Sequence, residues 1–319
     1  MAHLDELRLI VRVARMYYQW EVKQSEIARQ LGLSQPTVSR LLAEARTRGI
    51  IRTSVTVPHG IHIELEEELV RHYRLRDAIV VDCTSDDDER RIERDLGAAA
   101  AYVIETSLRP NEVIGISSWS STLMALVDAM HTTPRKGDMR VVQILGGVGD
   151  PSAEVHASRL TNRFADLIGG QAVFLPAPGI VGSLAMREVI MDDRYVRAAV
   201  ATFAQVTTAL VGIGAVEPSK LLAASGNVFA QAEIDLLRER GAVGDILLHF
   251  FNKEGKAVLS PLNDRVISMP LDQLARVDRS VGVAGGARKR QAILGALRGR
   301  WINVLITDHY TAQWLLDQG

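Results

Sequence analysis

Apolar residues recur at helical spacing near the start of the chain and predict three helices there. The first is predicted by an apolar set made of Leu7, Ile10, Val11, Ala14, Tyr17 and Tyr18. The second is short, with Ile27, Ala28 and Leu31 on one side, and it ends at Gly32, as helices often do at a glycine. The third is predicted by one stripe of apolar residues, Val38, Leu41, Leu42 and Ala45.

The third helix begins with polar groups that can bond to the edges of DNA bases. Ser34 is placed to cap this helix with its side-chain oxygen, and Pro36 lies in the first turn, where a missing backbone donor costs little. The candidate DNA-contacting residues on this helix are Ser34, Gln35, Pro36, Thr37, Ser39 and Arg40. Two short helices around a glycine turn, the second with such a face, suit the DNA major groove. The alternative is an ordinary helical hairpin with a solvated polar face.

The pattern changes from helical to alternating after Gly49. Apolar and polar residues alternate from Ile51 to Val57 as they do in a strand, which predicts the wing of a winged helix-turn-helix. Arg46, Arg48 and Arg52 are candidates for contacts with phosphates. Residues 1–60 contain nine Lys and Arg against five Asp and Glu, whereas the whole chain has a formal net charge of −1. A basic head on an acidic body has the sign expected for binding nucleic acid.

Residues 61–76 predict a connecting helix, and a regular alternation of strands and helices follows it. Strands are predicted at 78–81, 113–116, 140–145, 172–175, 209–213, 246–250, 281–284 and 303–306, and helices at 89–106, 152–168, 227–240 and 289–297. Strands of this apolar kind that alternate with helices are typical of an α/β domain with a doubly wound, mostly parallel sheet. The predicted domains are a DNA-binding head (1–58), a connector helix (59–76) and an effector domain (77–319).

Small and polar residues follow several of the predicted strands, at the edge where parallel sheets bind ligands. One turn, "SSWSST", consists of Ser117, Ser118, Trp119, Ser120, Ser121 and Thr122 and opens a helix. Gly146 and Gly147 follow another strand, and Lys289 stands in "GGARK" after a third. Glycine alone is weak evidence, because tight strand-to-helix turns use it anyway. Together with the hydroxyl cluster, however, these turns favour a pocket for a polyol or a sugar phosphate.

Composition narrows the class of protein further. The chain has 319 residues, 47% hydrophobic and 24% charged, as expected for a globular protein of two or three domains. No apolar run is long enough to span a membrane, and the N-terminus does not have the pattern of a signal peptide. The single Cys83 excludes an internal disulfide and indicates a reducing cytoplasm. His59 and His62 are interpreted as a loop pair, so neither a metal nor a cofactor is expected.

The chain resembles the SorC family of sugar-binding transcriptional regulators along nearly its whole length. The resemblance rests on "MYYQWEVKQSEIARQLGLSQPTVSRLLAEARTRGII" in the head and on "VVQILGG", "GAVGDILLHFF" and "VAGGARKRQAILGALRGRWINVLITD" in the body. It implies a winged helix-turn-helix joined to a domain similar to sugar-phosphate isomerases, which senses a sugar without turnover, in oligomers that are commonly tetramers. It places effector contacts at the turn 117–122, at Gly146 and Gly147, and around Asp245 and Lys289, with Arg187 as a further candidate.

The chain departs from the family at this turn, because serine stands at position 120 where members often have glycine. The departure leaves open whether the effector is a phosphorylated sugar or a free polyol. Trp119 has two possible roles, stacking on a sugar face or packing in the protein.

The sequence therefore predicts a DNA-binding transcriptional regulator controlled by a small carbohydrate and lacking catalytic activity. Its predicted partners are operator DNA, the effector and other copies of the chain, in a dimer or tetramer, with no membrane association. The alternative is a sugar-phosphate isomerase or deaminase with an accessory head, for which Asp150, Asp245 and Asp308 are the available acids. Such an enzyme needs a placed acid/base pair, and no compact acid–histidine arrangement follows the strands. A plain oligomeric scaffold would leave the polar face of the third helix unexplained.

Overall fold

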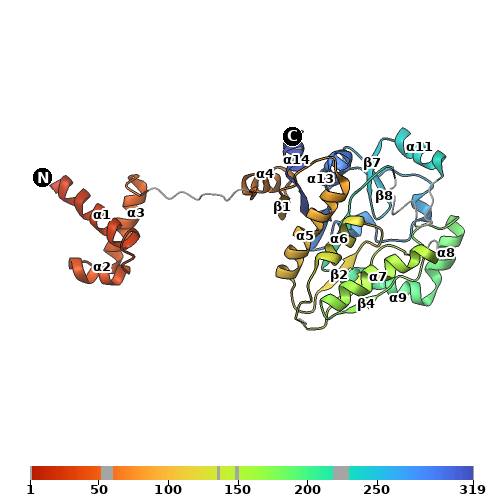
Figure 1. Ribbon diagram of the computed structural model, residues 1–319, viewed down its shortest axis with the longest axis horizontal. Coiled ribbons are helices and arrows are strands. Elements are labelled where there is room, and N and C mark those ends of the chain that lie inside the picture. Colours follow the sequence, from red (N-terminus) through yellow and green to blue (C-terminus); the bar gives the residue numbers. More distant parts are fainter. Residues whose placement is uncertain (1, 52–59, 135–136, 148–150, 218–229, 319) are drawn as a thin grey trace. The chain divides into compact units, whose positions relative to one another are not determined.

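The chain divides into two compact units, Met1–Pro58 and His59–Gly319. The structure, a computed structural model, describes residues 2–51, 60–134, 137–147, 151–217 and 230–318 (Figure 1). Each unit has a hydrophobic core of its own. The two units are therefore described separately.

Unit 1 consists of the helices α1 (Ala2–Tyr18), α2 (Gln24–Leu31) and α3 (Gln35–Thr47) (Figure 1). Its core contains the fully buried residues Ile10, Val13, Ile27, Val38 and Ala45. The turn between α2 and α3 passes through Gly32, whose φ of 64° is a left-handed conformation that glycine adopts without strain. The predicted wing, 51–57, lies almost entirely outside the described residues.

The set of residues that α1 buries differs from the predicted set. Val11 and Tyr18 are 40% and 39% exposed, whereas Val13 and Met16, which the apolar pattern did not include, are buried. The reason is that α1 contacts α3 more extensively than α2, and this contact buries the Ile10–Val13–Ala14 side of α1. Val11 lies away from that side.

Unit 2 is built on a seven-stranded sheet in which every pair of neighbouring strands is parallel. The strands are β1 (Asp77–Val81), β2 (Val113–Ile116), β3 (Arg140–Gln143), β4 (Gln171–Val173), β5 (Thr208–Gly212), β9 (Arg279–Val283) and β10 (Val304–Asp308). Their order across the sheet is β1-β10-β9-β5-β2-β3-β4. The predicted α/β class with a mostly parallel sheet is thus confirmed.

Helices cover both faces of this sheet. The α-helices that the structure describes in this unit are α4 (Ile63–Tyr73), α5 (Glu89–Ser107), α6 (Ser121–Ala129), α7 (Pro151–Leu167), α8 (Leu184–Asp192), α9 (Arg194–Ala201), α11 (Gln231–Glu239), α12 (Leu271–Leu274), α13 (Arg290–Arg298) and α14 (His309–Leu316). The interior strand β2 is buried along its length, with Val113 in one apolar cluster and Ile114 and Ile116 in the other. This alternation explains why the strand reads as a continuous apolar run, since both of its faces are covered.

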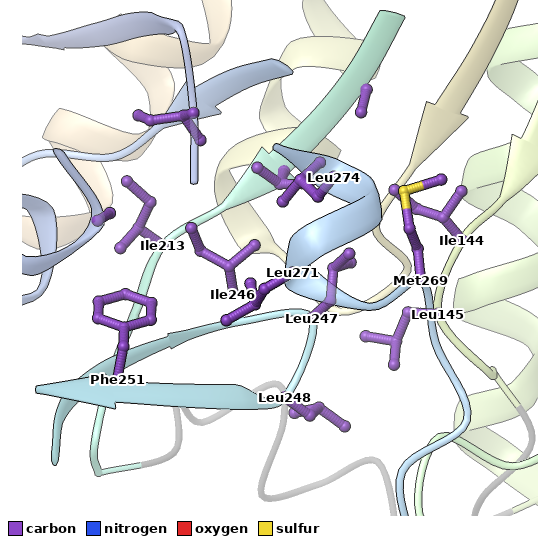
Figure 2. Close-up of a cluster of buried hydrophobic side chains, with 14 of the residues drawn as sticks. Ile144, Leu145, Ile213, Ile246, Leu247, Leu248, Phe251, Met269, Leu271 and Leu274 are labelled. Carbon is purple, nitrogen blue, oxygen red and sulfur yellow. The ribbon is translucent and has the colours of Figure 1, made fainter. Parts of the chain in front are cut away.

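A second, small sheet lies beside the main one and corrects one predicted strand. It is antiparallel and consists of β6 (Gly214–Ala215), β7 (Ala242–Ile246) and β8 (His249–Asn252). The segment 246–250 was predicted as one strand, but Leu247 and Leu248 form a turn with φ values of 56° and 66°. Both side chains are buried in an apolar cluster (Figure 2), so an apolar run here marks a buried turn.

The helix predicted as a connector packs against the sheet of unit 2. Leu69 of α4 is fully buried, and the Glu66 carboxylate accepts a hydrogen bond from the Val80 backbone N–H of β1 at 2.9 Å. Tyr73 donates from its hydroxyl to the Leu315 carbonyl oxygen of α14 at 2.6 Å. These contacts make α4 part of the α/β unit.

Candidate functional site

The turn after β2 is tied to the end of β3 by two side-chain hydrogen bonds. The Ser118 hydroxyl donates to the Leu145 carbonyl oxygen at 2.9 Å, and the Trp119 indole N–H donates to the Gly146 carbonyl oxygen at 3.1 Å. Ser118 is 1% exposed and Trp119 7% exposed. The Ser117 N–H donates to the Leu210 carbonyl oxygen of β5 at 3.0 Å. The turn is therefore fixed between the carboxyl ends of β3 and β5.

The next two serines open helix α6. Ser120 is the N-cap residue, and its side-chain oxygen accepts a hydrogen bond from the Leu123 N–H at 3.3 Å. The Ser121 hydroxyl donates to the Glu93 carboxylate of α5. The first backbone N–H groups of a helix have no partners within it, and the helix dipole favours negative charge there. The start of α6 is consequently suited to an anionic or oxygen-rich ligand.

A pocket opens in front of this helix, at the carboxyl ends of β2 and β5. Six residues predicted from the sequence line it together: Ser117, Trp119, Ser120, Ser121, Asp245 and Lys289. The remaining lining residues are Leu145, Gly212, Ile213, Gly214, Ala215, Glu217, Leu247, Leu248 and Arg288. Four of these, Leu145, Ile213, Leu247 and Leu248, also belong to the buried apolar cluster of Figure 2. The pocket thus combines apolar lining residues with polar and charged ones.

Two cations reach the pocket from the short helix η3 (Ala287–Lys289). Gly286 precedes η3 with a φ of 89°, and its N–H donates to the Asp308 carboxylate at 2.7 Å, which fixes the turn. Burial lowers the pKa of the Lys289 ammonium, and its group makes no ion pair with any residue that the structure describes. Arg288 pairs with Glu89 of α5. Of the two, Lys289 is the cation that a bound anion would relieve most, because its partly buried charge lacks an ion-pair partner among the described residues.

The pKa values of two carboxyl groups of the pocket are shifted in opposite directions. Burial raises the pKa of Asp245 to about 6, although a hydrogen bond from the Leu248 N–H at 3.0 Å acts in the opposite direction. Glu217 accepts hydrogen bonds from Arg238 at 2.6 and 3.2 Å, and these lower its pKa. Glu217 is therefore an ionised acceptor at neutral pH, whereas Asp245 can also hold a proton in mildly acidic solution.

The other predicted effector residues lie outside this pocket. Ser118 and Gly147 are buried, and Thr122 lines a separate small cavity beside Lys289. Gly146 is required by packing, since an added Cβ atom would lie 2.3 Å from the Pro178 carbonyl oxygen. Arg187, on α8, donates to the Val266 carbonyl oxygen at 2.9 Å. The effector contacts predicted for these five residues therefore stay predictions.

Sequence reasoning missed several pocket residues for different reasons. Arg288 directly precedes Lys289 in the same turn after a predicted strand, so the same reasoning could have identified it. Glu217 follows the strand-end glycine Gly214 at the same edge of the sheet, where polar residues are informative. Leu247 and Leu248 could not be assigned, because their segment had been interpreted as a strand.

The exposed start of α3 in unit 1 keeps the predicted arrangement. Gln35, Pro36, Ser39 and Arg40 are exposed, opposite the buried stripe of the same helix. Ser34 caps the helix by accepting from the Thr37 N–H at 3.3 Å, and its hydroxyl lies 2.8 Å from that of Thr37, which is partly buried.

Two of the predicted phosphate-contacting arginines have protein partners. Arg46 donates to the Tyr18 hydroxyl at 2.6 and 3.0 Å, and Arg48 forms an ion pair with Glu44. Both guanidinium groups remain at the surface of unit 1. Arg52 lies outside the described residues.

Two expectations from composition concern the chain as a whole. Within the described ranges, the helices are too short or too polar to cross a membrane. Cys83 is buried, and burial raises the pKa of its thiol to about 12, so the thiol stays protonated at neutral pH. This agrees with a structural role for the side chain.

Comparison with known proteins gives consistent matches along the whole chain. The family model described as "Putative sugar-binding domain" matches residues 59–317. The chain is 33% identical over 313 residues to the deoxyribonucleoside regulator of Bacillus subtilis (strain 168), covering 98% of each. It is 30% identical over 318 residues to the sorbitol operon regulator of Klebsiella pneumoniae, covering 99% of this chain and 100% of that one. The crystal structure of full-length SorC from Klebsiella pneumoniae matches with a TM-score of 0.73 and 29% identity, covering 98% of this chain and 99% of that one.

The fold, the pocket and these relatives define a class of protein: a transcriptional regulator with a helical head and a ligand-binding α/β unit. The chain belongs to the SorC family of sugar-binding transcriptional regulators. It is a sugar-responsive transcriptional regulator, as the sequence predicted, and the interpretation as an isomerase or deaminase is not favoured. The prediction that the protein is not an enzyme is likewise confirmed, by relatives that are regulators.

Proposed function

We propose that the pocket in front of α6 binds the effector and that the effector carries an anionic group such as a phosphate. The observation that supports this most directly is the meeting of Lys289, Arg288 and the start of α6 in one pocket. A lysine whose pKa is lowered by burial gains most from an anion, because the anion restores the interactions that its charge lost. The helix start adds unpaired backbone donors on the same side of the ligand.

The uncharged part of the effector is proposed to be a polyol or sugar chain. Ser117 and Ser120 offer hydroxyls to the pocket, and Asp245 and Glu217 offer carboxylate oxygens. Such groups hydrogen-bond sugar hydroxyls without requiring a fixed ring shape. Trp119 contributes apolar surface, while its indole N–H is already bound to the protein.

The test is a thermal-shift screen of the full-length protein against sugar phosphates, the same sugars without phosphate, and polyols. A phosphorylated compound is expected to stabilise the protein, by roughly 2.7 kcal/mol at a hundredfold excess over its dissociation constant. The shift should disappear in Lys289→Met. It should persist in the control Lys253→Met, whose ammonium is exposed and lies 3.8 Å from Glu254. An unphosphorylated polyol that binds Lys289→Met as well as the wild type would contradict the anionic effector.

Operator DNA is proposed to be read by the exposed start of α3, chiefly by Gln35 and Arg40. Their exposure opposite a buried stripe supports this, because a recognition helix presents its first residues to base edges. Arg46, Arg48 and Arg52 are proposed to contact phosphates. Such a regulator acts where its DNA is, in the cytoplasm.

The protein is further proposed to work as a homo-oligomer, a dimer or a tetramer. Helix α8 has none of its residues buried, and Leu184, Met186 and Val189 are 47%, 53% and 73% exposed. Tyr195 of α9, which lines an apolar groove with Phe174, is 60% exposed. Exposed apolar surface of this kind commonly marks a protein interface. Sedimentation of the wild type and of Val189→Asp tests the proposal: the variant should dissociate toward monomers, and two identical profiles would contradict the use of this face.

Paired heads would explain how an effector changes DNA binding. Two heads that read two half-sites gain affinity by linkage, and an effector shifts that affinity only by its own differential affinity for two arrangements of the oligomer. The effector is therefore expected to alter operator binding by the full chain and to leave residues 1–60 unaffected on a half-site. A response in the isolated head would contradict this mechanism.

A further inference from the structure

Three side chains from separate elements of unit 2 converge away from the effector pocket. They are His62, the N-cap residue of α4, Asp82, which directly follows β1, and His309, the first residue of α14. The Nε2 atom of His62 lies 3.4 Å from the Oδ1 atom of Asp82, and the Nδ1 atom of His309 lies 3.5 Å from the same oxygen. One donor atom from each residue lies within 4.8 Å of the other two.

The two histidine–aspartate separations are close to the edge length of a zinc coordination sphere, and the separation between the two imidazole nitrogens is at most 4.8 Å. Zn²⁺ binds imidazole nitrogen and carboxylate oxygen at about 2.0–2.1 Å in tetrahedral geometry, which places neighbouring donor atoms about 3.3 Å apart. Two histidines and one carboxylate are also a donor set that divalent transition metals prefer to Mg²⁺ or Ca²⁺. The two imidazole rings stack at an interplanar angle of 13°, with centroids 5.0 Å apart. Because the lone pair of an imidazole nitrogen lies in the plane of its ring, binding one ion would require the two stacked rings to rotate toward it.

The surroundings leave these donor atoms available. The Nδ1 atom of His309 is buried and makes no hydrogen bond with the residues that the structure describes. The neighbouring Asp308 is not a competing ligand, because its carboxylate already accepts from the N–H groups of Gly286 and Thr311. The side chains of His62 and His309 are 24% and 22% exposed, and that of Asp82 is 47% exposed. The cluster is thus partly open, which leaves a fourth coordination position accessible to water.

We propose that His62, Asp82 and His309 form a binding site for a divalent transition-metal ion of the zinc type. The sequence did not predict a metal, because it compared His62 only with the nearby His59. The partners of His62 come instead from the two adjacent strands at one edge of the sheet, β1 and β10. A bound ion would fix the first turn of α4, which follows unit 1 in the chain, to the carboxyl ends of these strands. The site shares no residue with the proposed effector pocket.

The test is calorimetric titration of tag-free, full-length, chelator-treated protein with Zn²⁺. The wild type should bind one ion per chain, and Mg²⁺ at the same concentration should give no binding. His62→Gln, Asp82→Asn and His309→Gln should each weaken the Zn²⁺ affinity by at least about tenfold. His131→Gln is the matched control, since its imidazole is 87% exposed and faces Glu105 in another part of the unit, and it should bind like the wild type.

A second measurement separates loss of ligands from loss of folding. Co²⁺ bound by the wild type should give visible absorption bands that disappear in His62→Gln, while the circular dichroism of the metal-free variant matches the wild type. If His309→Gln fails to fold, the Zn²⁺ affinity of His62→Gln still tests the proposal. A wild-type affinity weaker than about 0.1 mM, or Zn²⁺ binding that His62→Gln leaves unchanged, would overturn the proposal.

Discussion

The indole N–H of Trp119 donates a hydrogen bond to the backbone oxygen of Gly146 at 3.1 Å. This bond joins the turn that follows β2 to the end of the neighbouring strand β3. The Ser118 hydroxyl makes a similar bond to the oxygen of Leu145, one residue earlier in the segment that follows β3. The wall of the pocket in front of α6 is therefore held by the protein itself, and a ligand would not have to order it.

Replacing Trp119 by Phe should consequently act on stability first. The variant keeps an aromatic ring and leaves the Gly146 oxygen without its partner, which should lower the free energy of unfolding by about 1–2 kcal/mol. Urea denaturation of Trp119→Phe and, separately, of Ser118→Ala measures the loss of unfolding free energy, which should be similar in the two variants. Unchanged stability combined with a lost effector response would show instead that the indole contacts the sugar.

Gly146→Ala should destabilise unit 2 through a steric clash. An added Cβ atom would lie 2.3 Å from the Pro178 carbonyl oxygen, and relieving this contact requires the backbone to move, at a cost of about 1–3 kcal/mol. Gly182→Ala is the matched control, because nothing lies within 4 Å of the atom it would add. Thermal unfolding of the two variants should therefore differ. Equal melting temperatures would mean that the 178–179 backbone yields easily.

Arg40→Ala should change which operator sequences the protein prefers. Arg40 is exposed at the start of α3, and loss of a base-reading residue typically costs about 1–3 kcal/mol and relaxes preference at one base pair. Arg29→Ala is a control on the same unit, since Arg29 is exposed on α2 and paired with Glu26 at 2.7 Å. Binding to a randomised operator library, followed by sequencing, gives both affinity and preference. Identical base preferences for Arg40→Ala and the wild type would remove Arg40 from the recognition surface.

Asp245 should make the protein less stable as pH rises from about 4 to about 6. Its pKa is raised from 3.8 to about 6 in the folded protein, so the folded state holds this proton more tightly than the unfolded state does. The stabilisation that protonated Asp245 contributes to the folded state is present below pH 3.8. It is lost as the pH rises through the folded pKa, and the total loss is about 3 kcal/mol. Asp245→Asn should lack this loss. The unfolding free energies of the variant and the wild type are compared from pH 4 to 7.5. The variant should become increasingly more stable than the wild type as the pH rises, and a constant difference between the two proteins would contradict the prediction.

The fold was predictable from sequence because the main strands are buried on both faces. Residues 113–116, for instance, form an uninterrupted apolar run, and runs of this kind between helices are typical of a parallel sheet. Six of the fifteen residues that line the pocket were also predicted. Ser117 and Lys289 stand shortly after predicted strands, and strand ends meet at one edge of a parallel sheet whatever the strand order is.

What could not be predicted depends on contacts between distant segments. Leu247 and Leu248 were predicted to be part of a strand. Instead, the Leu248 N–H donates to the Asp245 carboxylate, and the Ser268 hydroxyl donates to the Leu247 carbonyl oxygen at 2.9 Å. These two hydrogen bonds fix a turn. The histidine–aspartate cluster requires β1 and β10 to be neighbours, although they are the first and last strands along the chain. No local pattern carries that information.

The hydrogen bond that the Val80 N–H donates to the Glu66 carboxylate also protects the sheet from other molecules. Strand β1 lies at the edge of the seven-stranded sheet, and an uncovered edge offers unpaired N–H and carbonyl groups to any extended chain that meets it. Helix α4 closes part of this edge with a carboxylate, whose negative charge would repel an incoming backbone oxygen. A version of the α/β unit beginning at Asp77 would therefore lack this cover and should aggregate through β1.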